Sequence, residues 1–339
     1  MSHPDSINLL NSKISFAESK NIIHNLNSAR NTIFIADSNV FALYKKLLSD
    51  YKVIIIPPGE QYKTFERASI IYENLLDLEL DRHSQIIAVG GGIVCDIAGF
   101  VASTFLRGVK FSFIPTTLLA MVDASIGGKN GLNLGGYKNI IGTFSAPENI
   151  FIYTDFLQTL PEIEISNGLA ELTKSALVWN EKLFKYLEKN SEKILNLKKN
   201  EINHVIWEAV KIKSEIVKQD EKELSVRKIL NFGHTLAHGI EKTNQLSHGK
   251  AVSIGMRYAL EISAHFGNIS NETKERILGL LTKFGLPISI KITDQLLLAL
   301  SKDKKRNSSS VDFILLSKIG EAEIKNIELS DLKQLLKKC

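Results

Sequence analysis

The sequence predicts two domains, an α/β domain with a parallel sheet followed by an all-α domain. Its 339 residues are too many for one ordinary core and suit two domains of about 150 residues each. In the first half, short β-branched runs alternate with stretches that have helical spacing of apolar residues. Helical spacing dominates the second half, so we place the domain boundary between residues 157 and 158.

Four buried strands are predicted in the first domain, each from a short run rich in β-branched residues. Between them, Thr64–Leu78 and Ile93–Phe105 carry apolar residues at helical spacing. Strands and helices that alternate in this way build a parallel sheet covered by helices, which binds nucleotides at its carboxyl edge. Residues 1–157 are therefore expected to form a Rossmann-like nucleotide-binding domain. The predicted strands are Asn31–Ala36, Tyr51–Ile56, Gln85–Val89 and Lys110–Ile114.

The second domain, residues 158–339, is predicted to be all-α apart from one short β-like piece, Val311–Leu316. Each expected helix has apolar residues recurring three and four positions apart. The expected helices are Pro161–Trp179, Glu181–Leu197, Glu201–Lys218, Arg227–Lys242, Lys250–Phe266 and Asn271–Phe284.

Composition narrows the classes of function. The chain has 42 basic and 37 acidic residues, and its densest basic clusters are short and lack interleaved aromatic residues. This pattern disfavours nucleic acid as a partner and fits anionic small molecules better. The two cysteines, Cys95 and Cys339, cannot form a framework of disulfides, which indicates a reducing compartment. No apolar run approaches the ~20 residues of a membrane helix and no secretory signal is evident, so we expect a cytoplasmic protein.

A glycine run follows the third predicted strand. Gly90-Gly91-Gly92 stands between Gln85–Val89 and a helix, and glycine lets backbone N–H groups approach an anion at a helix N-terminus. The dinucleotide fingerprint is incomplete, because Cys95 occupies its third glycine position. A structural turn would explain the glycines almost as well, but their place after a buried strand favours a nucleotide site. Other residues that follow strands and would share this edge are Asp37, Pro57-Pro58-Gly59-Glu60, Thr116 and Thr117.

Acidic and imidazole side chains stand out in the second domain. Glu171 lies in a helical segment that is otherwise apolar on that face, His234 and His238 are four residues apart, and His248 stands at a helix N-terminus. Two histidines and one carboxylate match the ligands of catalytic zinc, which keeps one position open for substrate oxygens. The spacing does not choose between His238 and His248 as the third ligand.

A polar stripe is predicted along one of these helices. Its members are spaced by four, three, four and three residues and would share one helix face with apolar residues on both sides. Such a stripe is expected to face an internal cleft. Its members are Arg227, Asn231, His234, His238 and Glu241.

The segment from residue 115 to 144 is dense in glycine, lysine and asparagine. Lysine and amide donors beside glycines suit an anionic substrate, because the chain can fold tightly around it. No Walker motif is present, which disfavours ATP. A flexible surface loop would have a similar composition. The notable residues are Asp123, Gly127-Gly128-Lys129, Asn133, Lys138-Asn139 and Gly142.

From about Asp37 to Gly320 the chain resembles the 3-dehydroquinate synthase family of sugar-phosphate cyclases. The resemblance implies an NAD-binding α/β domain, a helical domain, a homodimer, and NAD with a divalent metal (zinc or cobalt) as cofactors. The motifs that carry it are GGGIVCDIAGFVASTFLRG, PTTLLAMVDASIGGKNGLN, KNIIGTF, GLAELTKSAL, RKILNFGHTLAHGIE and HGKAVSIGM.

The resemblance also implies roles for individual residues. The metal ligands would be Glu171, His234 and His248, which leaves His238 to the substrate. Catalytic positions would be Lys129, Lys174, Lys213, Glu223, Arg227, Asn231 and His238. The substrate would also meet Asp123, Lys138, Asn139, Lys304 and Lys305, with Arg107 reaching the substrate phosphate of the neighbouring subunit. NAD would meet Asp37, Glu60, Lys63, Gly91, Gly92, Asp96, Thr116, Thr117, Lys129, Lys138 and Thr159.

The implied activity is that of a carbon–oxygen lyase in the shikimate pathway of aromatic amino-acid biosynthesis. Transient oxidation of 3-deoxy-D-arabino-heptulosonate 7-phosphate by NAD⁺ would permit phosphate elimination. Re-reduction and an intramolecular aldol step would then give 3-dehydroquinate. Alternatives are a cyclase that makes an aminated or valiolone-type ring, or a metal-dependent polyol or glycerol-phosphate dehydrogenase of the same superfold. One departure from the family is Lys250, where glutamate is usual.

Overall fold

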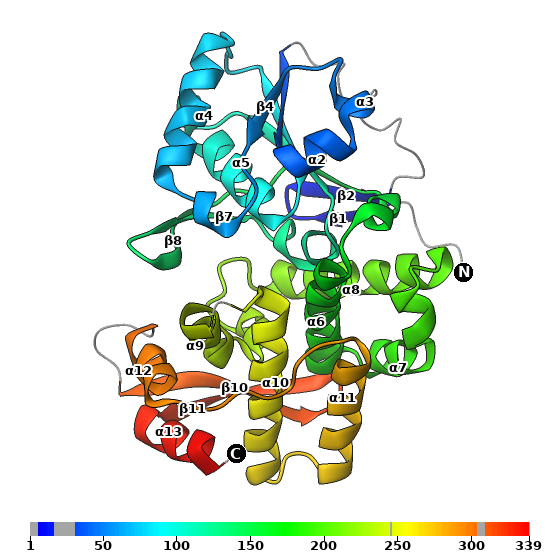
Figure 1. Ribbon diagram of the computed structural model, residues 1–339, viewed down its shortest axis with the longest axis vertical. Helices are drawn as coiled ribbons and strands as arrows, with labels where there is room; N and C mark the ends of the chain where they lie inside the picture. The colour runs from blue at the N-terminus through cyan, green and yellow to red at the C-terminus, as the bar shows by residue number, and fades with distance from the viewer. Residues whose placement is uncertain (1–5, 17–30, 245, 304–308, 339) are drawn as a thin grey trace. The chain divides into compact units, whose positions relative to one another are not determined.

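The computed structural model describes residues 6–16, 31–244, 246–303 and 309–338. The chain divides into two compact units. We call the first the sheet unit; it extends to Leu160 and also includes Lys213–Lys218. The second, the helical unit, comprises Pro161–Ile212 and the chain from Gln219 onward. In Figure 1 most of the sheet unit is blue to green, and most of the helical unit is green to red.

The described residues of the sheet unit form a seven-stranded sheet in the order β1-β2-β9-β6-β5-β3-β4. Only the β1–β2 pair is antiparallel, and the other pairs are parallel. All four predicted strands are present and adjacent, which confirms the Rossmann-like prediction. The bounds are β1 Ser6–Leu9, β2 Ser12–Phe16, β3 Thr32–Asp37, β4 Val53–Ile56, β5 Gln85–Gly90, β6 Lys110–Pro115 and β9 Asn149–Ile152.

Helices and short turns connect these strands. The two predicted helices are α4, Phe65–Asp77, and α5, Gly92–Thr104. Most of α5 is buried, because it is apolar on almost every side and packs on β5 and β6. The other elements are α2 Ser38–Leu43, α3 Lys45–Leu48, η1 Glu60–Tyr62, η2 Phe105–Arg107, η3 Ala120–Ala124 and η4 Thr154–Thr159.

The segment from 115 to 144 is ordered rather than loop-like. It contains the π-turn η3 and an antiparallel hairpin formed by β7, Lys129–Leu134, and β8, Tyr137–Phe144. Gly135 and Gly136 make the two-residue turn with φ of +58° and +79°, which is typical of a tight hairpin. β7 packs against α5, so a helix in the sheet unit supports the lysine-bearing hairpin.

Among its described residues, the helical unit contains helices and one two-stranded antiparallel hairpin, β10–β11 (Figure 1). Five of the six predicted helices are confirmed, and β10 is the predicted β-like piece. None of the helices in the described part of the chain has the length and apolar character needed to span a membrane. The bounds are α6 Glu162–Trp179, α7 Glu181–Leu195, α8 Lys199–Gln219, η5 Val226–Asn231, α9 His234–Asn244, α10 His248–His265, α11 Asn271–Lys283, α12 Asp294–Asp303, β10 Ser310–Lys318, β11 Glu321–Glu328 and α13 Leu329–Lys338.

The predicted helix Arg227–Lys242 is wrong, because the chain breaks at Phe232 and Gly233 between η5 and α9. Gly233 has φ of +80° and packs against α10, where a Cβ on Gly233 would lie 2.7 Å from the backbone nitrogen of Met256. A Cβ on Gly255 would in turn lie 2.0 Å from the Gly233 carbonyl oxygen. The polar stripe therefore does not run along one helix face.

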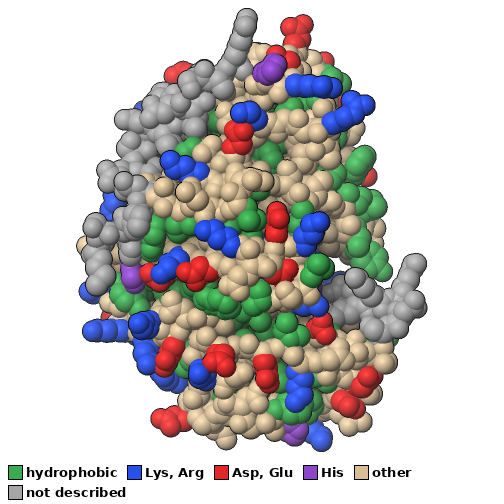
Figure 2. Space-filling model, turned by 180° about the vertical axis from the view of Figure 1, so that it is seen from behind, with side chains coloured by type: hydrophobic (Ala, Val, Ile, Leu, Met, Phe, Trp, Pro, Cys, Tyr) green, Lys and Arg blue, Asp and Glu red, His purple; other side chains and the backbone are tan. Residues whose placement is uncertain are grey.

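Charged side chains of both signs lie interspersed on the face of the molecule seen in Figure 2. Hydrophobic side chains are visible between them on the same face. This distribution matches the mixture of 42 basic and 37 acidic residues in the sequence.

Candidate functional site

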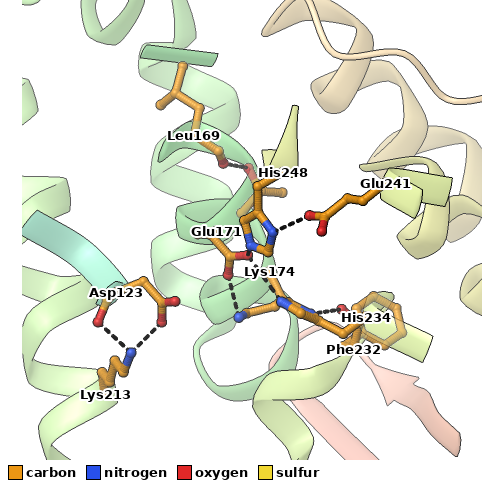
Figure 3. A network of polar contacts seen from close by, with 10 residues as sticks. Asp123, Leu169, Glu171, Lys174, Lys213, Phe232, His234, Glu241 and His248 are labelled. Atoms are coloured by element: carbon orange, nitrogen blue, oxygen red, sulfur yellow. Dashed lines mark hydrogen bonds and ion pairs between the residues drawn. The ribbon is translucent and has the colours of Figure 1, made fainter. Parts of the chain in front are cut away.

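Three side chains converge in the helical unit. Glu171 lies on α6, and His234 and His248 are the first residues of α9 and α10. One ligand atom from each lies within 4.8 Å of the others. Glu171 Oε1 is 3.0 Å from His248 Nε2 and 3.4 Å from His234 Nε2. Figure 3 shows the three side chains pointing toward one another.

Close packing of α10 on α6 brings His248 to Glu171. A Cβ on Gly249 would lie 2.3 Å from the Asn167 Cα, so only glycine allows this approach. Ser247 Oγ donates a hydrogen bond to Asn167 Oδ1 at 2.8 Å. Asn167 and Glu171 are one helical turn apart and share a face of α6. Ser247 and Gly249 both contact Asn167. The imidazole of His248, which lies between them in the sequence, therefore reaches the carboxylate of Glu171, one helical turn further along α6.

Each histidine uses its second nitrogen to face a protein oxygen. His248 Nδ1 lies 2.6 Å from Glu241 Oε1, and His234 Nδ1 lies 3.4 Å from the Phe232 carbonyl oxygen. Both Nε2 atoms are thus directed toward Glu171, as a metal site requires (Figure 3). Glu171 Oε2 forms an ion pair with Lys174, whose side chain is almost fully buried.

The charges around the cluster favour a cation at its centre. Burial alone would raise the pKa of Glu171, but Lys174, His234 and His248 hold it well below its usual range. Burial and Lys174 lower the pKa of His234 to about 4, so its imidazole is neutral. Burial opposes the proton on His248, but Glu171 and Glu241 raise its pKa to about 10. Carboxylates that favour a proton there also favour a metal ion in its place.

The residues present fit a divalent metal. Two imidazoles and one carboxylate, each from a different helix, form the donor set of catalytic zinc sites that keep a position open. His238 stays outside this group of ligand atoms; its ring centroid lies 5.8 Å from that of His234. Of the two histidines that the spacing left open, His248 is the one that completes the cluster.

A compact loop after α8 brings together three residues predicted at catalytic positions, Glu223, Arg227 and Asn231. Asn231 Nδ2 donates to Glu223 Oε1 at 2.7 Å, and Arg227, only 3% exposed, donates to the carbonyl oxygen of Glu221. Asp220 organises this loop, because its carboxylate accepts backbone N–H groups of three residues. These are Leu224 at 2.9 Å, Ser225 at 2.7 Å and Arg227 at 3.1 Å.

Asp123 and Lys213 meet in the sheet unit. Lys213 Nζ donates to both the carbonyl oxygen and Oδ1 of Asp123, each at 2.5 Å (Figure 3). Lys213 is only 6% exposed and lies in the Lys213–Lys218 segment that groups with this unit. The pair joins residues 90 positions apart and fixes the direction of the ammonium group.

The glycine run lies where a nucleotide site was predicted. Gly91 precedes α5 at the end of β5, an interior strand between β6 and β3, and Thr116 donates its N–H to the Gly90 carbonyl oxygen at 2.9 Å. A Cβ on Gly91 would lie 3.0 Å from Thr117 Cγ2, and one on Gly92 would lie 3.0 Å from Ala124 Cβ. Close packing therefore favours glycine at both positions. A helix N-terminus at the carboxyl edge of a parallel sheet also fits a pyrophosphate.

The remaining predicted residues of the sheet unit occupy defined places. Lys63 is 3% exposed, pairs with Asp96 and donates to Asn139 Oδ1 at 2.5 Å. Asp37 ends β3 and caps α2 by accepting two backbone N–H groups. Thr159 Oγ1 lies 2.5 Å from the hydroxyl of Tyr44. Lys129, Lys138 and Arg107 are exposed, and Lys304 and Lys305 lie outside the described residues.

Three residues that matter to these sites were not predicted as site residues. Glu241 was assigned only to the polar stripe, and Asn133 only to the lysine-rich segment. Asn133 donates from Nδ2 to Glu60 Oε1 at 2.8 Å and accepts the N–H of Asn139 at 2.9 Å. Asp220 carried no signal beyond the turn-forming type of its side chain.

The fold and these sites define a class of protein: two units, one with a mostly parallel sheet of the nucleotide-binding type and one with two histidines around a buried carboxylate. A family model described as 3-dehydroquinate synthase N-terminal matches residues 53–167, and one described as 3-dehydroquinate synthase C-terminal matches residues 168–306. The chain belongs to the 3-dehydroquinate synthase family, as its motifs predict.

Relatives with assigned functions agree with the family models. A 3-dehydroquinate synthase of Thermoanaerobacter pseudethanolicus is 42% identical over 319 residues, which cover 90% of each chain. That of Campylobacter concisus is 40% identical over 315 residues, covering 89% of this chain and 90% of the relative.

Solved structures share the fold over nearly the whole chain. The 2-epi-5-epi-valiolone synthase ValA of Streptomyces hygroscopicus, with NAD⁺ and Zn²⁺ bound, is 26% identical, with a TM-score of 0.89 and 99% of each chain covered. A 2-deoxy-scyllo-inosose synthase complexed with carbaglucose-6-phosphate, NAD⁺ and Co²⁺ is 24% identical, with a TM-score of 0.86 and 98% of each chain covered. The latter likeness shows the fold alone.

Proposed function

We propose that this chain converts 3-deoxy-D-arabino-heptulosonate 7-phosphate into 3-dehydroquinate and phosphate, a carbon–oxygen lyase reaction of the shikimate pathway. The observation that carries the proposal is the cluster of Glu171, His234 and His248 around the buried Glu171 carboxylate, in a chain 42% identical to a 3-dehydroquinate synthase over 90% of both chains. The chain acts as a cytoplasmic homodimer with NAD and zinc or cobalt.

The cluster would hold the metal through Glu171 Oε1 and the two Nε2 atoms. A divalent ion there would polarise the oxygens of the substrate as a Lewis acid. NAD would lie along the carboxyl edge of the sheet and would supply an acceptor that takes up a hydride and returns it within one catalytic cycle. The residues expected to contact it are Asp37, Glu60, Lys63, Gly91, Gly92, Asp96, Thr116, Thr117, Lys129, Lys138 and Thr159.

The remaining residues would bind and orient the substrate. Lys129, Lys138 and Asn139 present ammonium and amide donors for the phosphate, joined by Arg107 of the neighbouring subunit. The ammonium groups of Lys213 and Lys174 are fixed by Asp123 and Glu171 and would place positive charge beside the substrate oxygens. His238 would donate or relay a proton. Glu223, Arg227 and Asn231 complete the substrate set, with Lys304 and Lys305.

The main rival is a cyclase that makes a valiolone-type ring, because the ValA structure has a TM-score of 0.89 with this chain. Identity favours the dehydroquinate product, since it is 42% to the 3-dehydroquinate synthase and 26% to ValA.

A substrate comparison tests the proposal. Purified protein with NAD⁺ and Zn²⁺ receives either the heptulosonate 7-phosphate or sedoheptulose 7-phosphate, and the carbocyclic product is identified by mass spectrometry. We expect dehydroquinate from the first sugar, with kcat/KM at least about 100-fold above that for the second, because sedoheptulose 7-phosphate lacks a carboxylate and a site built for one would bind it less well. Preference for sedoheptulose 7-phosphate would contradict the proposal and indicate the valiolone-type reaction.

A further inference from the structure

Asn133, near the end of β7, has a carboxamide whose two ends are fixed by different partners. Its Oδ1 accepts the backbone N–H of Asn139 at 2.9 Å, and its Nδ2 donates to Glu60 Oε1 at 2.8 Å. A backbone N–H only donates and an ionised carboxylate only accepts. The carboxamide therefore has one possible orientation, and Asn133 links two segments of the sheet unit.

Further hydrogen bonds close this link into a ring. The backbone N–H of Asn133 donates to the Lys63 carbonyl oxygen at 2.8 Å. Lys63 Nζ then donates to Asn139 Oδ1 at 2.5 Å. The segment from Glu60 to Lys63 thus holds the hairpin at Asn133 and at Asn139.

The ring sets the backbone conformation at the start of β8. Asn139 has φ of +53°, a left-handed conformation that asparagine tolerates better than most residues but adopts only when neighbouring groups hold it. The N–H of Asn139 donates a hydrogen bond to Asn133, and the side chain of Asn139 accepts one from Lys63. Lys138 directly precedes Asn139, so the ring constrains the backbone next to this lysine.

We propose that Asn133 is a positioning residue that couples nucleotide binding to phosphate binding. The inference rests on the proposed function, which assigns Glu60 and Lys63 to NAD and Lys138 and Asn139 to the substrate phosphate. A nucleotide that orders the segment from Glu60 to Lys63 also orders the hairpin through Asn133. The two ligands then tighten each other's binding by the same factor.

The variant Asn133→Asp tests the coupling. It keeps the shape and the acceptor for the N–H of Asn139, but it places a carboxylate against Glu60. Titration calorimetry of the Zn²⁺-loaded protein measures the Kd of inorganic phosphate with and without saturating NAD⁺. In the wild type we expect NAD⁺ to tighten phosphate binding about tenfold, and in Asn133→Asp we expect this factor to fall to about one.

A double variant distinguishes coupling from a general loss of structure. In Asn133→Asp/Glu60→Gln the amide donates from position 60 and the carboxylate accepts at position 133, so the hydrogen bond is restored with its direction reversed. We expect it to recover most of the tenfold factor. Asn74→Asp adds the same charge to an exposed residue of the sheet unit and is expected to match the wild type.

Three outcomes would overturn the inference. The first is a wild-type Kd for phosphate that does not change with NAD⁺. The second is a coupling factor that is the same in Asn133→Asp as in the wild type, and the third is a coupling factor that the double variant fails to restore. These titrations need no turnover. A chain that shows the coupling but releases no product from the heptulosonate 7-phosphate would count against the proposed function and not against the role of Asn133.

Discussion

Glu241 orients His248, a proposed metal ligand, and is not itself a proposed ligand. Its carboxylate lies 2.6 Å from His248 Nδ1 and is nearly buried, so it fixes the ring with Nε2 toward Glu171. A carboxylate in this position also makes the imidazole a stronger donor to a metal. The sequence placed Glu241 near the histidines, but its contact with His248 depends on how α9 and α10 pack.

We predict that Glu241→Gln lowers the affinity for Zn²⁺ by about 10- to 100-fold, because the amide keeps the size of the side chain and removes its charge. Competition with a chromophoric chelator measures this Kd. Glu188→Gln, which removes a carboxylate paired with Arg276 and not with the cluster, is the matched control and should bind zinc like the wild type. Equal zinc affinity in Glu241→Gln would show that this carboxylate does not support the site.

At the scale of elements, the loop between α8 and α9 depends on one carboxylate. Asp220 accepts three backbone N–H groups, and these bonds lower its pKa from 3.8 to about 2, although burial acts in the opposite direction. A carboxyl group with a lowered pKa in the folded state stabilises the protein above its ordinary pKa. That contribution is lost as the pH falls from 3.8 toward about 2.

We predict that Asp220→Asn unfolds at lower urea concentration than the wild type at pH 6, and that the difference shrinks as the pH falls below about 4. The asparagine carries no charge and offers only one acceptor oxygen to the three N–H groups. Urea unfolding followed by circular dichroism from pH 6 to pH 3 measures the difference between the urea midpoints of the variant and the wild type. Asp294→Asn, which changes a carboxylate 97% exposed, is the control. A difference in urea midpoint that stays constant with pH would show that the charge of Asp220 does not stabilise the loop.

Elements with strong local patterns could be predicted from the sequence, and elements set by packing could not. β3, β5 and α6 follow from apolar periodicity. The hairpin β7–β8 was missed because its outer strand is largely exposed and its composition is that of a loop. The break at Gly233 was missed because it results from contact with α10, and a helical spacing of polar residues continues across it.

At the scale of the whole molecule, the chemistry is divided between the two units. The sheet unit contains the glycine-capped α5, the hairpin and the Asp123–Lys213 pair, and the helical unit contains the carboxylate–dihistidine cluster and the Asp220 loop. The glycine run and the acidic and imidazole residues were predicted from the sequence and Lys213 from the family resemblance, whereas the hairpin and the role of Asp220 were not. That Lys213–Lys218 groups with the sheet unit could not be predicted, because the segment lies within a helix of the second half and its grouping depends on tertiary contacts.

We expect the protein to use NAD catalytically in a metal-dependent cyclisation of a heptulosonate phosphate. The measurement that tests this is a count, in one reaction with Zn²⁺ and a large excess of NAD⁺ over the enzyme, of the phosphate released and the NADH accumulated per active site. We expect many phosphates per site, NADH that never exceeds one per site, and loss of phosphate release on removal of the metal by chelation. Accumulation of one NADH for each substrate oxidised, with no phosphate released, would contradict it and would identify a dehydrogenase.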